Sequence, residues 1–188
     1  NVSALRLGAG GKVLLKAGCT WNGEKLLVQE ARGTSANPVI LGKYGEGENP
    51  KINGQGSKWL DEQDRTSLKK EEVAAVHIRN SAYITIKDLE VTNLEEDRKD
   101  LEGKLGRTNV NALSPGVKIT HDQSKYMLTG ILVENHDAGE LAGVKIENNY
   151  VHDVNGYMSQ NGSEGDKKGS GGIMVLVTGG NTESYFKD

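Results

Sequence analysis

The sequence of 188 residues predicts an all-β protein built of stacked coils, because one pair of strands recurs along the chain. The first copy has strands at 76–80 and 84–93, and the second has strands at 131–135 and 144–153. A third copy begins at 172–177. Each strand alternates apolar and polar residues, and a unit this small cannot bury a hydrophobic face alone. Stacking of the copies would give these faces a common core.

Composition supports many short strands. The chain has 25 Gly but only 3 Pro, and its aromatic residues include one Phe and two Trp. A compact helical domain would use more aromatic mass, whereas Gly together with Val and Ile is typical of short strands joined by tight turns.

Four further strands are expected before the first copy. Turns rich in Gly, Asn and Ser separate them, and no helical period lies between them. One of them opens with Pro38, which is tolerated as the first residue of a strand. The four expected strands are 12–16, 26–29, 38–42 and 50–54.

Two long polar segments interrupt the copies, at 94–130 and 156–171. The first could hold a short amphipathic helix over 94–105, and the second is rich in Gly and Ser without periodicity. Both follow the second strand of their copy, so in a stack they must leave along the same edge. Insertions gathered on one edge commonly form one side of a binding site.

Several classes of partner are not expected. The net charge is −3, and no cluster of Lys and Arg is interleaved with aromatics, so we expect no nucleic-acid partner. No apolar run approaches about 18 residues, so no membrane span is predicted. The single Cys19 excludes an internal disulfide, and no spacing of ligand residues predicts a metal site.

The N-terminal part resembles bacterial right-handed parallel β-helix proteins that act on carbohydrates. The similar residues are GKVLLKAGCTWNG at 11–23, NPVILGKYGEG at 37–47 and PKING at 50–54. The later segment VKIENNYVHDV at 144–154 is similar to the repeat of that group. The resemblance covers roughly 1–56, 74–93 and 130–186.

This resemblance implies a single partial domain over 1–188, a right-handed parallel β-helix solenoid of which only the N-terminal coils are present, with the first coils in 1–56. It also implies a secreted or cell-surface bacterial protein and an oligosaccharide or polysaccharide substrate. The remaining coils would then follow on the same or a second chain.

The same architecture carries glycoside hydrolases, polysaccharide lyases, pectin esterases and adhesins. The lacto-N-biosidase type of gut bacteria is among the glycosidases considered, although no catalytic signature of that type can be transferred residue by residue. We favour a glycoside hydrolase. A lyase should show a basic groove, and an adhesin should show few insertions.

Glycoside hydrolysis uses two carboxyl groups, about 5–5.5 Å apart for retention and about 6.5–9.5 Å apart for inversion. Coils about 4.8 Å apart offer both separations. Asp153 and Asp166 are the predicted catalytic pair, with His152 and Glu164 as substrate-binding residues. The aligned copies place Asp153 opposite Asn93. In the alternative interpretation, Asp153 caps a turn and the acidic loop residues are merely solvated.

A second acidic cluster lies on the first strand of the second copy. Glu134 is predicted to bind substrate there, beside His136 and Asp137, although Asp137 could instead begin a turn.

We expect no cofactor for a hydrolase, whereas a lyase would need a base and could use Ca²⁺ to neutralise the substrate carboxylate. The acidic run at 95–100 contains Arg98 and Lys99, so it reads as a solvated face rather than a Ca²⁺ site. A non-catalytic glycan-binding or structural module is the third alternative.

The first prediction concerns residues 1–188 expressed alone. The last residues, 183–188, read as the start of an unpaired strand, and an open strand edge invites pairing with other chains. We therefore expect no stable monomer. Size-exclusion chromatography and thermal unfolding test this, and a monomer that melts cooperatively would contradict it.

Overall fold

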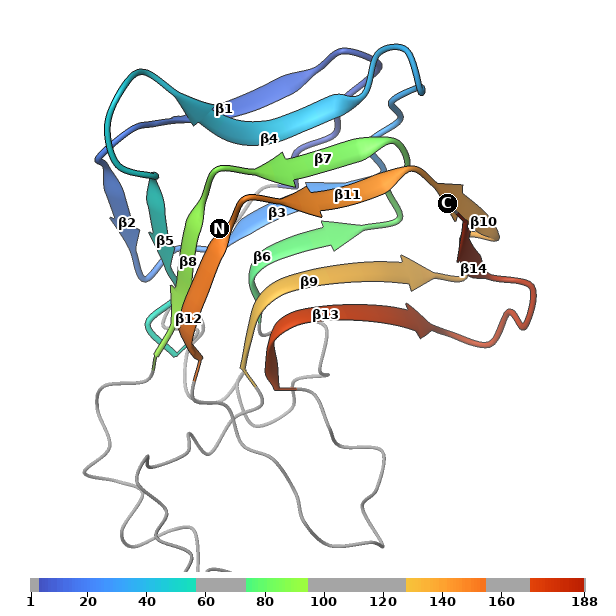
Figure 1. The fold of residues 1–188 in the computed structure, drawn as a ribbon. Helices are drawn as coiled ribbons and strands as arrows, with labels where there is room; N and C mark the ends of the chain where they lie inside the picture. The colour runs from blue at the N-terminus through green and yellow to red at the C-terminus, as the bar shows by residue number, and fades with distance from the viewer. Residues whose placement is uncertain (1–3, 57–73, 95–127, 155–169, 188) are drawn as a thin grey trace, which may run out of the picture.

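The computed structural model describes residues 4–56, 74–94, 128–154 and 170–187 (Figure 1). Within these ranges the chain forms strands and turns and no helix, so none of the described residues offers a helix that could cross a membrane. The helix expected over 94–105 falls, apart from residue 94, outside the described residues.

Three parallel sheets of four strands each form the body of the molecule. The first sheet has the order β1 (Lys12–Lys16), β4 (Val39–Tyr44), β7 (Ile84–Lys87), β11 (Val144–Glu147). The second has the order β2 (Thr20–Asn22), β5 (Lys51–Asn53), β8 (Glu90–Asn93), β12 (Tyr150–Val154). The third has the order β3 (Leu26–Gln29), β6 (Ala74–Arg79), β9 (Thr129–His136), β13 (Gly171–Thr178).

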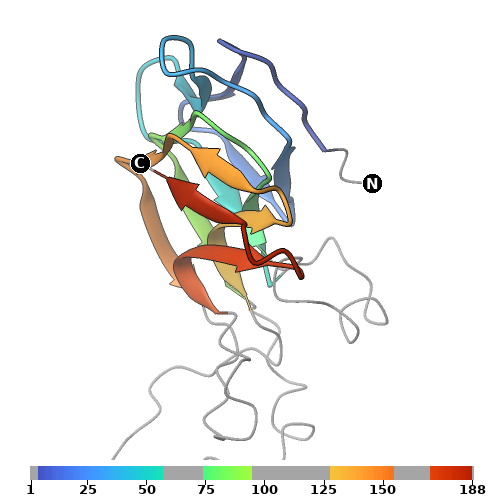
Figure 2. The same ribbon diagram turned by 90° about the vertical axis from the view of Figure 1, so that its right-hand side faces the viewer.

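Successive strands belong to different sheets. The chain places one strand in each sheet and then returns to the first sheet beside its earlier strand. We call each such set of three strands a coil. A short parallel pair of β10 (Glu140–Ala142) and β14 (Tyr185–Lys187) lies beside the last two coils (Figures 1 and 2). The prediction of an all-β chain with stacked parallel strands is confirmed for the described residues.

The sequence located most strands well. The expected strands 12–16 and 26–29 coincide with β1 and β3, and the next two differ from β4 and β5 by one or two residues at their ends. The structure adds β2, whose three residues are too short to show a period. Strand β9 begins one residue before the expected end of the first insertion, and β13 begins at the last residue of the second.

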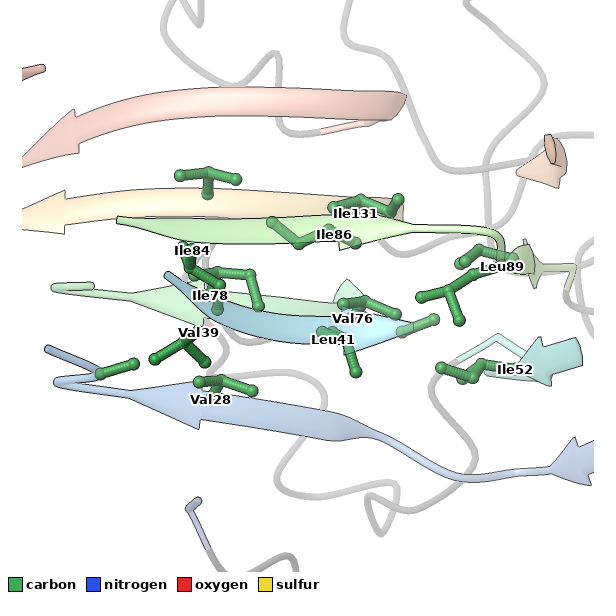
Figure 3. Packing of buried hydrophobic residues seen from close by; sticks show 14 residues of the cluster. Val28, Val39, Leu41, Ile52, Val76, Ile78, Ile84, Ile86, Leu89 and Ile131 are labelled. Carbon is green, nitrogen blue, oxygen red and sulfur yellow. The ribbon is translucent and has the colours of Figure 1, made fainter. Parts of the chain in front are cut away.

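The core lies between the three sheets and consists of aliphatic ladders (Figure 3). Leu41 of β4 pairs with Ile86 of β7, which pairs with Ile146 of β11. Alternation along each strand turns one face inward, so equivalent residues of successive coils pack on one another. Full burial of such a side chain contributes about 1.5–3 kcal/mol, and Leu41 and Ile86 are both completely buried.

Asparagine side chains join neighbouring coils at the corners. The Asn80 side chain accepts a hydrogen bond from His136 N at 2.7 Å and donates one to His136 O at 3.1 Å. Asn149 accepts from Leu89 N at 3.1 Å and donates to Ile86 O at 2.9 Å. Both residues therefore replace backbone pairing where the chain changes direction, as expected for Asn at a turn.

The last coil exposes part of its inner face. Ile173, Val175 and Val177 of β13 pair with the inward positions of β9, yet their exposed fractions are 48%, 57% and 50%. Within the described part of the chain, β13 is an edge strand of its sheet. This edge offers both apolar side chains and unpaired backbone groups to a further strand.

The core prediction compares two leucines. Leu41→Ala should lower the free energy of unfolding by about 2–5 kcal/mol, because a fully buried side chain leaves a cavity. Leu14→Ala is the control, since Leu14 on the neighbouring strand is 40% exposed, and we expect a loss under about 1 kcal/mol. Chemical denaturation of the polypeptide that carries this domain measures both, and equal losses would contradict the assigned register.

Candidate functional site

A β-bulge lies at the end of β12. Relative to β8, Val151 pairs with Val91, but the next pair joins Val154 to Asn93. The bulge contains Asp153, whose φ of 49° is left-handed and uncommon for a residue other than Gly. The expected alignment of Asp153 with Asn93 was therefore wrong by one residue, because the bulge inserts an extra residue into β12.

The bulge brings two consecutive side chains together. Neighbours in a regular strand point to opposite faces, but His152 Nδ1 lies 2.9 Å from Asp153 Oδ2. The alternative in which Asp153 caps a turn involves residues after 154, which lie outside the described residues. Bulges often re-aim a side chain next to an active site, so this geometry favours the functional interpretation of Asp153.

His152 also reaches the preceding coils. Its Nε2 lies 3.0 Å from Glu90 Oε1, and Lys51 Nζ lies 2.9 Å from the same oxygen. The Tyr150 ring stacks on the His152 ring with centroids 4.1 Å apart and an interplanar angle of 20°. These five residues, from β5, β8 and β12, are here called the His152 cluster.

The cluster combines a shielded ring with an accessible carboxylate. The His152 side chain is 23% exposed, whereas that of Asp153 is 61% exposed. The hydrogen bond from Lys51 lowers the pKa of Glu90, and the contact with His152 acts in the same direction. Glu90 is therefore ionised at neutral pH and attracts positive charge to His152.

Two members of the cluster, His152 and Asp153, lie near the end of β12, where the chain leaves the described part of the structure, whereas Lys51, Glu90 and Tyr150 begin their strands. β5, β8 and β12 are neighbours in the second sheet, and each is followed closely by a segment outside the described residues. Asp153 is the last residue but one of β12. The predicted residues Asp166 and Glu164 lie outside the described residues, so the structure does not place them relative to Asp153.

Sequence reasoning missed Glu90 and Lys51. A signal for Glu90 was present, because the aligned copies put it opposite Tyr150, as the parallel register does. Lys51 pairs with Glu90 in the preceding coil. Neither residue belongs to a motif, so only the pairing of three coils shows that their side chains meet His152.

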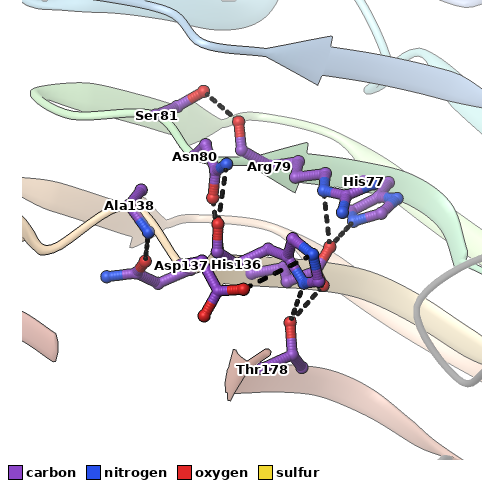
Figure 4. A network of polar contacts seen from close by, with 10 residues as sticks. His77, Arg79, Asn80, Ser81, His136, Asp137, Ala138 and Thr178 are labelled. Atoms are coloured by element: carbon purple, nitrogen blue, oxygen red, sulfur yellow. Dashed lines mark hydrogen bonds and ion pairs between the residues drawn. The ribbon is translucent and has the colours of Figure 1, made fainter. Parts of the chain in front are cut away.

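Glu134 has a different environment from the one predicted. Its side chain is fully buried, and Figure 4 shows the surrounding network from β6, β9 and β13. One carboxylate oxygen lies 3.0 Å from His77 Nε2 and 3.3 Å from Arg79 Nε. The other accepts a hydrogen bond from the Thr178 hydroxyl at 2.5 Å. Glu134 joins three coils, and its side chain offers a ligand no surface in this structure.

Burial and hydrogen bonding have opposite effects on the pKa values of Glu134 and His77. Burial would raise the pKa of Glu134, but hydrogen bonds from His77 and Thr178, with the charge of Arg79, outweigh it and lower the pKa. Burial lowers the pKa of His77 despite its contact with Glu134. A neutral His77 can donate its Nε2 proton to the carboxylate, and its buried Nδ1 has no hydrogen-bond partner among the described residues.

Asp137 has a structural position beside this network. Its carboxylate accepts a hydrogen bond from Asn181 N at 2.7 Å, and its φ of 53° is left-handed. This supports the interpretation of Asp137 as a turn residue. Across the described residues, no group of three or more His, Cys, Asp or Glu side chains is arranged to hold a metal ion.

Comparison with known proteins relates the chain to glycoside hydrolases. No protein-family model matches it. A lacto-N-biosidase of Bifidobacterium longum subsp. longum is 29% identical over 167 residues, which cover 83% of this chain and 10% of that protein. The chain thus spans about a tenth of the length of this curated relative.

Two crystal structures of the GH136 lacto-N-biosidase from Eubacterium ramulus have a similar fold. The native protein is 24% identical and the selenomethionine derivative 23%, each with a TM-score of 0.60. Each match covers 92% of this chain and 25% of the solved chain. At this identity the likeness concerns the fold.

Because of the network around Glu134, we expect the fold to lose stability at acidic pH. Because the pKa of Glu134 is lowered on folding, its stabilising contribution is present above the unfolded pKa of about 4.3 and is lost as pH falls through the folded value. His77 adds to the loss, because only the unfolded chain readily protonates it below about pH 6.5.

Glu134→Gln should therefore lower the free energy of unfolding at pH 7 by about 1.5–3 kcal/mol, the value of hydrogen bonds to a charged group. The loss should shrink toward pH 3. Denaturation series at several pH values measure this, with the exposed Glu147→Gln as control. A loss that is the same at every pH would contradict the ionised state of Glu134.

Proposed function

We propose that this chain is part of a glycoside hydrolase that acts on complex oligosaccharides or polysaccharides with a pair of carboxylic acids. The similarity to the Bifidobacterium lacto-N-biosidase carries this proposal, because it extends over 83% of the chain. The name of that relative makes oligosaccharides that contain lacto-N-biose the first substrates to test.

The fold proposed for the whole protein is a right-handed parallel β-helix. Three parallel sheets whose neighbouring strands come from successive coils support a solenoid. The hand follows from the strong preference for right-handed connections between parallel strands, found in about 98% of cases. The half-exposed inner face of β13 is suited to further coils, supplied by the same or a second chain.

Asp153 is proposed as one member of the catalytic pair. Its carboxylate is exposed, it lies in a bulge, and His152 contacts it at 2.9 Å. The second carboxyl group is proposed to be Asp166, with His152 and Glu164 contacting the sugar. Such a pair needs no metal or organic cofactor, since one carboxyl protonates the leaving group and the other supplies a nucleophile or base.

Secretion or display on a bacterial surface is proposed with this activity, because a glycoside hydrolase for complex glycans must meet its substrate. The solvent-facing position of the His152 cluster on the second sheet suits such a substrate. Sugar rings could stack on Tyr150, which is 61% exposed and lies three residues before Asp153.

The direct test is Asp153→Asn in the polypeptide that carries these residues. Hydrolysis of a lacto-N-biose-containing oligosaccharide should fall by about 10²–10⁴, because an amide cannot serve as nucleophile, acid or base. The melting temperature should not change, since the Asp153 side chain is exposed.

Product release is measured by chromatography, with Glu147→Gln as a matched control on the exposed face of β11. Wild-type turnover in Asp153→Asn would place the catalytic pair elsewhere in the protein.

A further inference from the structure

We propose that Lys51, Glu90 and His152 are positioning residues that hold the Asp153 carboxylate in one orientation through a doubly protonated His152. This inference rests on the proposed catalytic role of Asp153. It adds a division of labour within the carboxyl pair, in which Asp153 is the negatively charged member and the other carboxyl group carries the proton.

The first argument is the continuity of the contacts. Lys51 binds Glu90 at 2.9 Å, Glu90 binds His152 at 3.0 Å, and His152 binds Asp153 at 2.9 Å. Lys51, Glu90 and Tyr150 share one register across β5, β8 and β12. Since parallel strands lie about 4.8 Å apart, the backbone itself sets the spacing of this row of side chains.

The second argument is the proton balance at His152. Each ring nitrogen lies within hydrogen-bond distance of a carboxylate oxygen. A neutral imidazole has one N–H and one bare nitrogen, whereas an imidazolium donates from both. If one ring nitrogen carried no proton, that nitrogen would face a carboxylate oxygen with no proton to form a hydrogen bond between the two atoms. The doubly protonated ring satisfies both contacts and balances two negative charges.

Glu90 provides the fixed charge in this arrangement. The hydrogen bond from Lys51 lowers the pKa of Glu90, so this carboxylate stays ionised and favours the imidazolium. Among the described residues, His152 contacts the carboxylates of Glu90 from the neighbouring coil and Asp153 from its own strand, and Lys51 contacts Glu90. The imidazolium in turn stabilises the negative charge on Asp153.

Stacking holds the ring in place. Tyr150 covers one face of the His152 ring at a centroid distance of 4.1 Å, and the side chain is only 23% exposed. The left-handed φ of Asp153 turns its carboxylate toward Nδ1 rather than to the opposite face of β12. A backbone conformation of this kind in a non-Gly residue persists only where the surroundings maintain it.

An ionised Asp153 has a defined part in the reaction. In a retaining reaction its oxygen bonds to the anomeric carbon while the glycosidic C–O bond breaks, and the leaving oxygen takes its proton from the other carboxyl group. In an inverting reaction Asp153 takes a proton from the attacking water, with the same proton transfer to the leaving group. In both schemes the contact with His152 Nδ1 holds the Asp153 carboxylate while it reacts.

The first test reads the proton state directly. In protein labelled with ¹⁵N in histidine, the nitrogen shifts of His152 at pH 7 should show both nitrogens protonated, with His152→Gln used for assignment. In Glu90→Gln one nitrogen should lose its proton, and in Glu140→Gln, the control from β10, His152 should be unchanged. A neutral His152 in the wild-type protein would overturn the proposal.

The second test is kinetic and uses a lacto-N-biose-containing oligosaccharide. Glu90→Gln and Lys51→Met should each lower kcat by roughly tenfold to a hundredfold. Losses of this size are typical when a residue that orients a metal ligand through a hydrogen bond is replaced. The pH–rate profile should change with kcat, because both substitutions alter the charge balance around His152. Lys51→Arg should restore both, since the charge is kept.

The outcomes separate this inference from the function on which it rests. If Asp153→Asn abolishes hydrolysis while Glu90→Gln and Lys51→Met keep the wild-type pH profile, the positioning role is wrong and the proposed function stands. If Asp153→Asn is fully active, the proposed role of Asp153 is wrong, and with it the catalytic part of this inference.

Discussion

Parallel hydrogen bonding between successive coils is the constraint on which the rest of this structure depends. It places equivalent residues of each coil one above another, about 4.8 Å apart. The aliphatic ladder of Leu41, Ile86 and Ile146 follows from this register. At the corners, where strands end, Asn80 and Asn149 supply the missing backbone partners through their amides. Core and corners are thus two results of one repeated pairing.

The same pairing brings charged side chains into contact, with different results on two sheets. On the third sheet Glu134 is enclosed by His77, Arg79 and Thr178, so its charge serves to join coils. On the second sheet His152 lies between two carboxylates, and one of them, on Asp153, stays exposed. Accessibility therefore separates a structural carboxylate from a candidate catalytic one, although both have histidine partners.

Much of the scaffold could be predicted from the sequence, because apolar alternation with Asn at the turns is a local pattern. Strands β1 and β3 and the turn role of Asn149 are examples. The candidate site was harder. Asp153 and His152 were singled out, but the partner Glu90 was not, since its contact with His152 spans 62 positions of sequence. The burial of Glu134 was missed as well, because alternation cannot show what covers an outward-facing residue.

By itself, the sequence determined that this protein consists of short strands that recur and must stack, since each apolar face is too small to be buried alone. It also determined which residues carry titratable groups near the ends of those strands. Only the tertiary structure decided which of these groups meet. The bulge at Asp153 shifts the register by one residue, and a shift of one residue reverses the face on which a side chain lies.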